Sequence, residues 1–216
     1  MSVVTLAANR RSEWVVPALL VLLSLVPAIA GTVRLVDLGL GAEVTERNAR
    51  FFASPLPVAL HILAVVPYSI LGAFQFSPGL RRRHRALHRA AGKVLLAAGF
   101  ISALTGLWMA QFYPWPEGDG VAVYLERIVF GGAMFLFLVL GAVAIPRRDF
   151  AGHGAWMIRA YAIGLGAGTQ ALTHLPYFVF VGRPDETARG FLMGAGWVIN
   201  VIVAEWILRR RPMLVL

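Results

Sequence analysis

The sequence has no cysteine and few charged residues. Only 14% of its 216 residues are Asp, Glu, Lys or Arg, whereas a soluble domain has about 25%. Without thiolates the chain cannot form disulfides, zinc–thiolate sites, iron–sulfur clusters or the covalent attachment of c-type haem. Any cofactor would have to be held by His, Met, carboxylates or packing. So few charges also cannot cover the surface of a soluble protein.

Apolar residues make up 58% of the chain and are gathered into long runs. Crossing a bilayer takes about 20 apolar residues in a helix, because every backbone polar group must be paired internally. We therefore predict an all-α, polytopic transmembrane bundle with six spans, forming a single domain over residues 1–216 with the lipid bilayer as its main partner. The predicted spans are Trp14–Val33, Leu56–Phe76, Ala90–Phe112, Leu125–Ile145, Trp156–Phe180 and Phe191–Leu208.

The basic residues between these runs are distributed asymmetrically. Fourteen of the twenty fall on alternate connections: Arg10, Arg11, Arg81, Arg82, Arg83, Arg85, Arg89, Lys93, Arg147, Arg148, Arg159, Arg209, Arg210 and Arg211. The positive-inside rule places this set in the cytoplasm, with both termini inside. Topology also accounts for the net charge of +9, so we expect no nucleic-acid partner. A signal peptide cleaved near Ala28–Ala30 is an alternative for the first run and would leave five spans.

Histidines inside hydrocarbon are the first candidates for function, because buried polar groups are costly there. His61 and His174 are predicted near the outer face, and His88 and His153 near the cytoplasmic face. Neutral imidazole ligates haem iron, so two histidine pairs in one bundle favour a site for b-type haem. Gly164, Gly166 and Gly168 on the fifth span would leave room for a flat macrocycle.

Each of these features also has a structural explanation. Gly164 and Gly168 have the spacing of residues that let membrane helices pack closely. His84 and His88 stand in an arginine-rich stretch suited to phosphate headgroups. His174 precedes Pro176 by two residues, so it can bond a carbonyl that the proline frees. Both interpretations of the histidines stay open on the sequence alone.

A polar cluster is predicted near the cytoplasmic side. It comprises Gln75, Arg159, Asn200 and Glu205. Arg159 and Glu205 are candidates for an ion pair, which would be either a clasp between helices or part of a pocket or proton relay. In the haem hypothesis, Arg159 instead neutralises a propionate.

Several strings resemble a family of uncharacterised bacterial membrane proteins, of the type called domain of unknown function 2306. The strings are Gly72-Ala73-Phe74-Gln75-Phe76, His88-Arg89 with Gly92-Lys93, His153 with Trp156-Met157-Ile158-Arg159-Ala160-Tyr161-Ala162, and Asn200 with Glu205. The resemblance implies a multi-pass protein of the bacterial inner membrane. It singles out His61, His88, His153, Arg159 and Glu205, implies no reaction, and leaves His174 outside the pattern.

Three functions therefore remain. The first is a haem-binding or redox-coupled protein that uses His61, His88, His153 and His174. The second is a transporter or small-molecule-binding protein whose pocket is lined by the polar cluster. The third is an accessory subunit of a larger complex or a homo-oligomer, for which small residues on the helix faces suffice. Whether the protein is an enzyme is not indicated by any motif.

Overall fold

A computed structural model describes the backbone of residues 3–210 and the side chains of residues 14–210, so the predicted cytoplasmic residues Arg10, Arg11 and Arg211 lie outside the described side chains. Within this range the chain is helical and has no strand, which confirms the all-α prediction. The elements are α1 (Val3–Leu40), α2 (Ala49–Ala53), α3 (Pro55–Gly72), the 3-10 helix η1 (Ala73–Phe76), α4 (Pro78–Arg83), α5 (Arg85–Phe112), α6 (Val121–Ala144), α7 (Phe150–Gly164), α8 (Gly166–Phe180) and α9 (Glu186–Arg210).

Five helices in the described part are long and apolar enough to cross a membrane. They are α1 from Trp14 onward, α3 together with η1, α5, α6 and α9. The predicted fifth span, Trp156–Phe180, is not one helix: it is divided at Leu165 into α7 and α8, of 15 residues each. The prediction of a continuous span there was wrong, because its glycines allow a break that hydropathy does not register.

Local sequence explains where several helices begin or end. Asp149 accepts a hydrogen bond from the backbone N–H of Gly152 at the start of α7, and Asp185 accepts one from Ala188 at the start of α9. Both are N-cap residues whose carboxylates satisfy free backbone donors. α5 ends at Phe112 before Tyr113-Pro114, since helical geometry is disfavoured for the residue preceding a proline.

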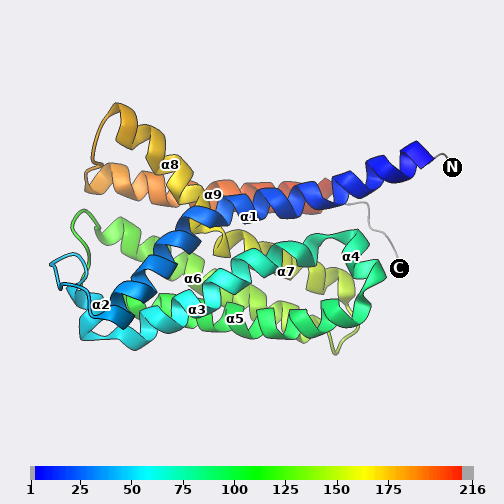
Figure 1. Cartoon of the computed structure of the whole chain (residues 1–216), viewed down its shortest axis with the longest axis horizontal. Helices are drawn as coiled ribbons and strands as arrows, with labels where there is room; N and C mark the ends of the chain where they lie inside the picture. The colour runs from blue at the N-terminus through cyan, green and yellow to red at the C-terminus, as the bar shows by residue number, and fades with distance from the viewer. Residues whose placement is uncertain (1–2, 211–216) are drawn as a thin grey trace.

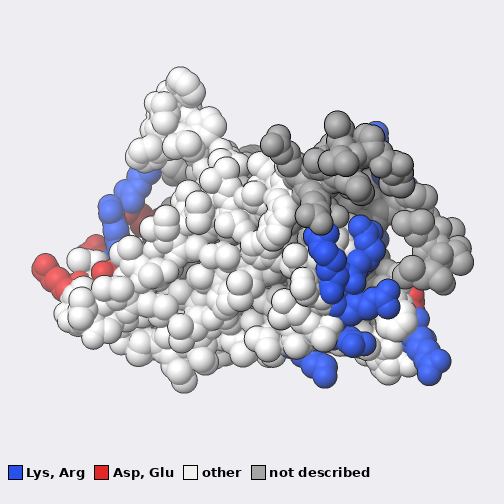
Figure 2. Space-filling model, turned by 45° about the vertical axis from the view of Figure 1, so that its right-hand side comes forward, with Lys and Arg blue, Asp and Glu red and all other residues white. Residues whose placement is uncertain are grey.

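The long helices lie side by side along one axis, and α8 diverges from them at one end (Figure 1). One end of this bundle contains the start of α1, the end of α9 and α4 (Figure 1). We call it the basic end because Lys and Arg side chains gather there (Figure 2). The other end, which carries α2 and the segment 113–120, we call the opposite end. The gathering of Lys and Arg side chains at the basic end follows the alternation of charge along the sequence.

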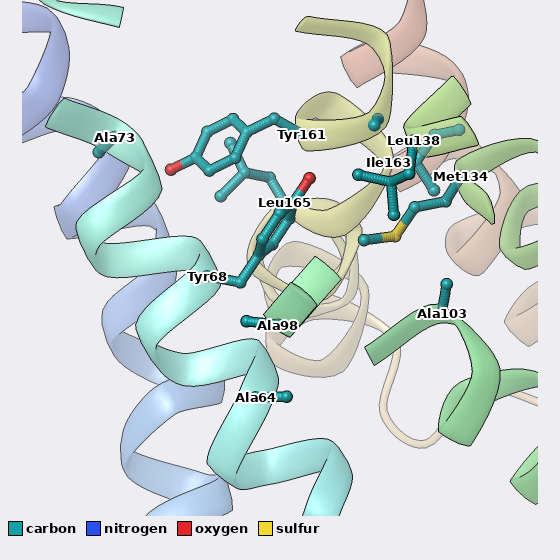
Figure 3. Close-up of a cluster of buried hydrophobic side chains, with 11 residues drawn as sticks. Ala64, Tyr68, Ala73, Ala98, Ala103, Met134, Leu138, Tyr161, Ile163 and Leu165 are labelled. Atoms are coloured by element: carbon teal, nitrogen blue, oxygen red, sulfur yellow. The ribbon is translucent and has the colours of Figure 1, made fainter. Parts of the chain in front are cut away.

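The buried core is small and aromatic in its centre. Tyr68 of α3 and Tyr161 of α7 point toward each other's helices, and Met134 and Leu138 of α6 pack beside them (Figure 3). The outward faces are apolar and exposed, as on α8, where Leu172, Leu175, Phe178, Val179 and Phe180 are all exposed. Such a distribution suits lipid as the surrounding solvent.

Candidate functional site

A side chain from α9 forms hydrogen bonds on both sides of the break between α7 and α8. The last carbonyls of a helix lack partners within it, and the carbonyl of Ala162 accepts a hydrogen bond from Asn200 Nδ2 at 3.0 Å. Asn200 Oδ1 accepts a second bond from the hydroxyl of Thr169, at 2.7 Å, in the first turn of α8. Asn200 therefore bonds both half-helices and fixes their relative position.

The glycines at this break are in contact with other helices. A methyl group on Gly164 would lie 2.8 Å from the ring of Tyr68, one on Gly166 would overlap Trp197, and one on Gly168 would overlap the backbone carbonyl of Leu23 in α1. The space that the sequence offered to a flat macrocycle is thus occupied by protein. The structural explanation, close packing of helices, accounts for all three glycines.

A cavity of about 430 Å³ lies between the break and the opposite end. Its floor is formed by Ile163, Gly164 and Leu165, and its walls come from α1, α3, α5, α6, α8 and α9. This volume falls within the range of about 300–1,000 Å³ that is usual for small-molecule sites. Uncharged polar side chains are set into the mainly apolar walls: Ser24, His61, Ser69, Ser102 and Gln170. Figure 2 shows the surface hollowed between the protruding helices and the main body, with charged side chains at the rim.

His61 is the histidine that lines the cavity. Its Nδ1 lies 3.0 Å from the carbonyl oxygen of Ser102 and 3.0 Å from the hydroxyl of Thr105. A carbonyl only accepts, so Nδ1 carries the hydrogen and donates it to Ser102. In neutral His61 this leaves a lone pair on Nε2, which can accept a hydrogen bond from a ligand or bind a metal.

Two arginines stand where the cavity meets the opposite end. Arg50 of α2 donates to the carbonyl of Pro114 at 3.3 Å and packs on Phe51, while its Nε is buried without a partner in the described part of the chain. Burial and, secondly, the charge of Arg127 lower the pKa of Arg50. Arg127 on α6 lines the same mouth.

Asp119 neutralises part of this positive charge. Its side chain is 1% exposed and ion-pairs with Arg127 at 2.6 Å and with Arg189 of α9. The backbone N–H of Asp119 bonds the carbonyl of Pro116, and Gly118 between them has a φ of +83°. That is the geometry of a type II turn, which needs glycine at its third position. The turn directs Asp119 toward the two arginines.

The other predicted haem ligands lie away from the cavity. His153 Nδ1 lies 2.9 Å from the carbonyl of Gly141, and His88 is close enough to His153 for their charges to interact. His174 Nδ1 bonds the carbonyl of Gln170 in its own helix, and its Nε2 is buried without a partner in the described residues. Residues 14–210 contain no group of three His, Cys, Asp or Glu arranged to hold a metal ion.

The predicted polar cluster is divided between three places. Arg159 and Glu205 form the expected ion pair, with Nε to Oε1 at 2.5 Å and a second bond at 3.0 Å, and Arg159 also lies 4.8 Å over the ring of Trp156. Asn200 instead bonds the helix break, and Gln75 lies beside Gly92 of α5. None of the four lines the 430 Å³ cavity.

Sequence reasoning missed Arg50, Arg127 and Asp119 as residues of a site. A signal was available for Asp119, because it stands between two glycines after a proline-containing turn. Arg127 sits inside an apolar helical run, two turns into α6. An arginine at such a depth is costly unless it is paired.

The strings that carry the family resemblance pack against each other. The ring of Tyr161 contacts Gly72, lies 4.8 Å from the ring of Phe76, and its hydroxyl donates to the carbonyl of Ser69 at 2.5 Å. These residues therefore join α3 and η1 to α7. Comparison with curated proteins and with solved structures finds no significant match. Residues 58–208 match the family described as "Predicted membrane protein (DUF2306)", and the chain belongs to that family.

Proposed function

We propose that this membrane protein binds a small molecule inside the bilayer, in the manner of a transporter, with the ligand in the 430 Å³ cavity. The observation that carries the proposal is the helix break at the cavity floor. Interrupted helices at membrane depth occur where the broken backbone lines a cavity. They are also typical of substrate sites in transporters. The pocket predicted around Arg159 and Glu205 is replaced by one in the other half of the bundle.

The proposal includes a topology of six crossings, with α7 and α8 together forming the fifth and both termini in the cytoplasm. At 1.5 Å per residue, α7 and α8 have a combined length of about 45 Å along their axes, which exceeds the hydrocarbon thickness and allows for the angle between them. The concentration of Lys and Arg at the basic end supports its cytoplasmic location. The single domain then lies in the bacterial inner membrane, and the cavity mouth faces outward.

Within the cavity, His61 and Gln170 are the groups that orient a ligand. His61 Nε2 accepts a hydrogen bond from a ligand donor, since Nδ1 is already committed to Ser102. The Gln170 side chain donates to the carbonyl of Met193 at 3.1 Å, which leaves its own carbonyl oxygen as an acceptor. A few fixed polar groups in an apolar cavity give orientation, and the apolar walls give affinity.

The proposal is tested by filling the cavity. Gly106 lines it, and a Cβ there would lie 3.4 Å from His61, so Gly106→Leu adds a side chain to the cavity without a severe clash. Gly132→Leu is the matched control, because that position faces open space. Native mass spectrometry should detect a bound small molecule in the wild type and Gly132→Leu but not in Gly106→Leu. A molecule retained in Gly106→Leu, or none in any sample, overturns the proposal and favours the accessory-subunit or homo-oligomer alternative.

Haem binding is the second candidate, and one observation favours it. His61, His153 and His174 each have Nδ1 next to a backbone carbonyl. That bond leaves Nε2 for a metal, as in ligating histidines. His88 and His153 would hold a haem near the basic end, and His61, with or without His174, a second one. Bound haem would supply one-electron transfer.

Absorption spectra separate the two candidates. The detergent-purified protein, expressed with adequate haem, is compared in its oxidised and dithionite-reduced forms with His88→Ala and His153→Ala. A reduced b-type band that disappears in the variants supports the haem candidate. A colourless, folded wild-type protein excludes it.

A further inference from the structure

We propose that the cavity ligand is an anionic amphiphile, with its acidic head between Arg50 and Arg127 and its apolar chain directed toward Trp197 and Leu165. The inference rests on the proposed function and names the chemical class of the ligand. It also gives the ligand an orientation, head toward the opposite end.

Arginines and carboxylates lie together at the mouth of the cavity. Arg127 and Arg189 both form ion pairs with Asp119. The neighbouring arginines are already paired: Arg34 with Asp37 at 3.6 Å, and Arg183 with Glu117 at 3.4 Å. Arg50, in contrast, forms no ion pair with a carboxylate in the described part of the chain.

Arg50 is the cation with unused bonding capacity. A guanidinium has five N–H donors, and Arg50 makes one hydrogen bond, to the carbonyl of Pro114, while its Nε is buried with no partner in the described residues. Buried donors are normally paired, so an unpaired one needs an explanation. A ligand carboxylate or phosphate would supply the acceptor, and arginine binds both in a two-pronged geometry.

The deeper part of the cavity suits a hydrocarbon chain. The lining residues of α5 and its C-cap extend from Ser102 to Tyr113. Eleven steps of 1.5 Å are a rise of about 16 Å, or about half the hydrocarbon thickness. Along it the walls are chiefly apolar, including Ile62, Met134 and Trp197. A free inorganic anion would occupy only the mouth and leave this apolar volume unfilled. A chain attached to the anion removes the apolar walls from contact with water.

The test uses dodecyl phosphate brominated at its terminal carbon, which quenches tryptophan fluorescence at short range. Trp197 lies at the deep end of the cavity, stacked on Phe130, and Trp115 lies at the mouth. In phosphatidylcholine nanodiscs, quenching should saturate, should be competed by unbrominated dodecyl phosphate, and should be largely lost in Trp197→Phe but retained in Trp115→Phe. If saturable quenching is lost in Trp115→Phe and retained in Trp197→Phe, the chain end lies at the mouth of the cavity. That result would overturn the proposed orientation.

Head-group charge is tested on the same signal. Replacing the phosphate by the neutral head of dodecanol, or Arg50 by Gln, should weaken binding by roughly 10- to 100-fold, the effect of one hydrogen bond to a charged group. Arg183→Gln is the matched control, since Arg183 is 62% exposed at the same end but does not line the cavity. The comparison of the two probes needs no variant, so it stands if Arg50→Gln does not fold.

The outcomes separate the ligand class from the proposed function. Equal binding of dodecanol and dodecyl phosphate overturns the anionic head but leaves a binding cavity. Competition by inorganic phosphate as strong as that by dodecyl phosphate identifies a free anion and overturns the amphiphile. Saturable binding that is unchanged in Gly106→Leu shows that the probe lies outside the cavity, which overturns both.

Discussion

Removing the hydroxyl of Tyr161 is expected to destabilise the fold by a measurable amount. Tyr161 donates to the carbonyl of Ser69 at 2.5 Å, within the buried core. In a regular helix that carbonyl would accept from the N–H of Ala73, but the helix changes to η1 there and Ala73 N–H bonds Leu71 instead. Tyr161→Phe therefore removes the hydrogen bond that Tyr161 donates to the carbonyl of the buried residue Ser69.

The size of the effect follows from measured hydrogen bonds between membrane helices. They contribute about 0.6 kcal/mol on average and up to about 1.7 kcal/mol, and leaving a buried acceptor unpaired costs about 1–3 kcal/mol. We expect a loss of about 1–2 kcal/mol, which for a chain of this length lowers Tm by about 2–8 °C. Neither the core volume nor the apolar area changes appreciably in this substitution.

Thermal unfolding in detergent, followed by intrinsic fluorescence, measures this loss. Tyr177→Phe is the control, because the hydroxyl of Tyr177 makes no hydrogen bond with the described part of the chain. If Tyr161→Phe unfolds within about 1 °C of Tyr177→Phe, the hydrogen bond does not stabilise the contact between α3 and α7. The sequence segments that resemble the family, around Gly72–Phe76 and Tyr161, would then stabilise the fold by packing alone.

Two further predictions concern topology and the charged mouth. The chain has no cysteine, so a single introduced thiol reports its own accessibility. In intact cells a membrane-impermeant maleimide should label Thr187→Cys, in the first turn of α9, and should label Ala151→Cys, at the start of α7, only after permeabilisation. Labelling of both in intact cells would refute six crossings. Asp119→Asn should cost about 3 kcal/mol, because its buried charge is shared by two arginines, and should lower Tm by about 6–12 °C. Glu117→Gln is the comparison, because Glu117 and its partner Arg183 have side chains that are 79% and 62% exposed. It should cost below about 1 kcal/mol. A similar loss of stability in Asp119→Asn and Glu117→Gln would contradict the role of burial.

Hydropathy and charge predicted most of the helices in the described part of the chain. Their apolar centres were placed correctly, and the structure extends them into charged segments, for example from Ala90 back to Arg85 in α5. A helix continues past the hydrocarbon because its backbone hydrogen bonds do not depend on apolar side chains.

The site could be predicted less well, for two physical reasons. The break at Leu165 has no proline and is bridged by Asn200, a residue 35 positions away that was assigned to another cluster. At the mouth of the cavity, a turn in a polar segment places the side chain of Asp119 in a buried position between Arg127 and Arg189. The sequence did not indicate that this carboxylate is buried. The ion pair of Arg159 and Glu205 was predictable, because both lie on apolar helices at matching depth.

The family match begins at residue 58, so it includes neither α1 nor α2. Yet α1 supplies one wall of the cavity through Ser24, Ala28 and Gly31, and α2 supplies Arg50. A ligand in the cavity would therefore touch both the matched range and the part of the chain before it, so the matched residues alone do not enclose the cavity.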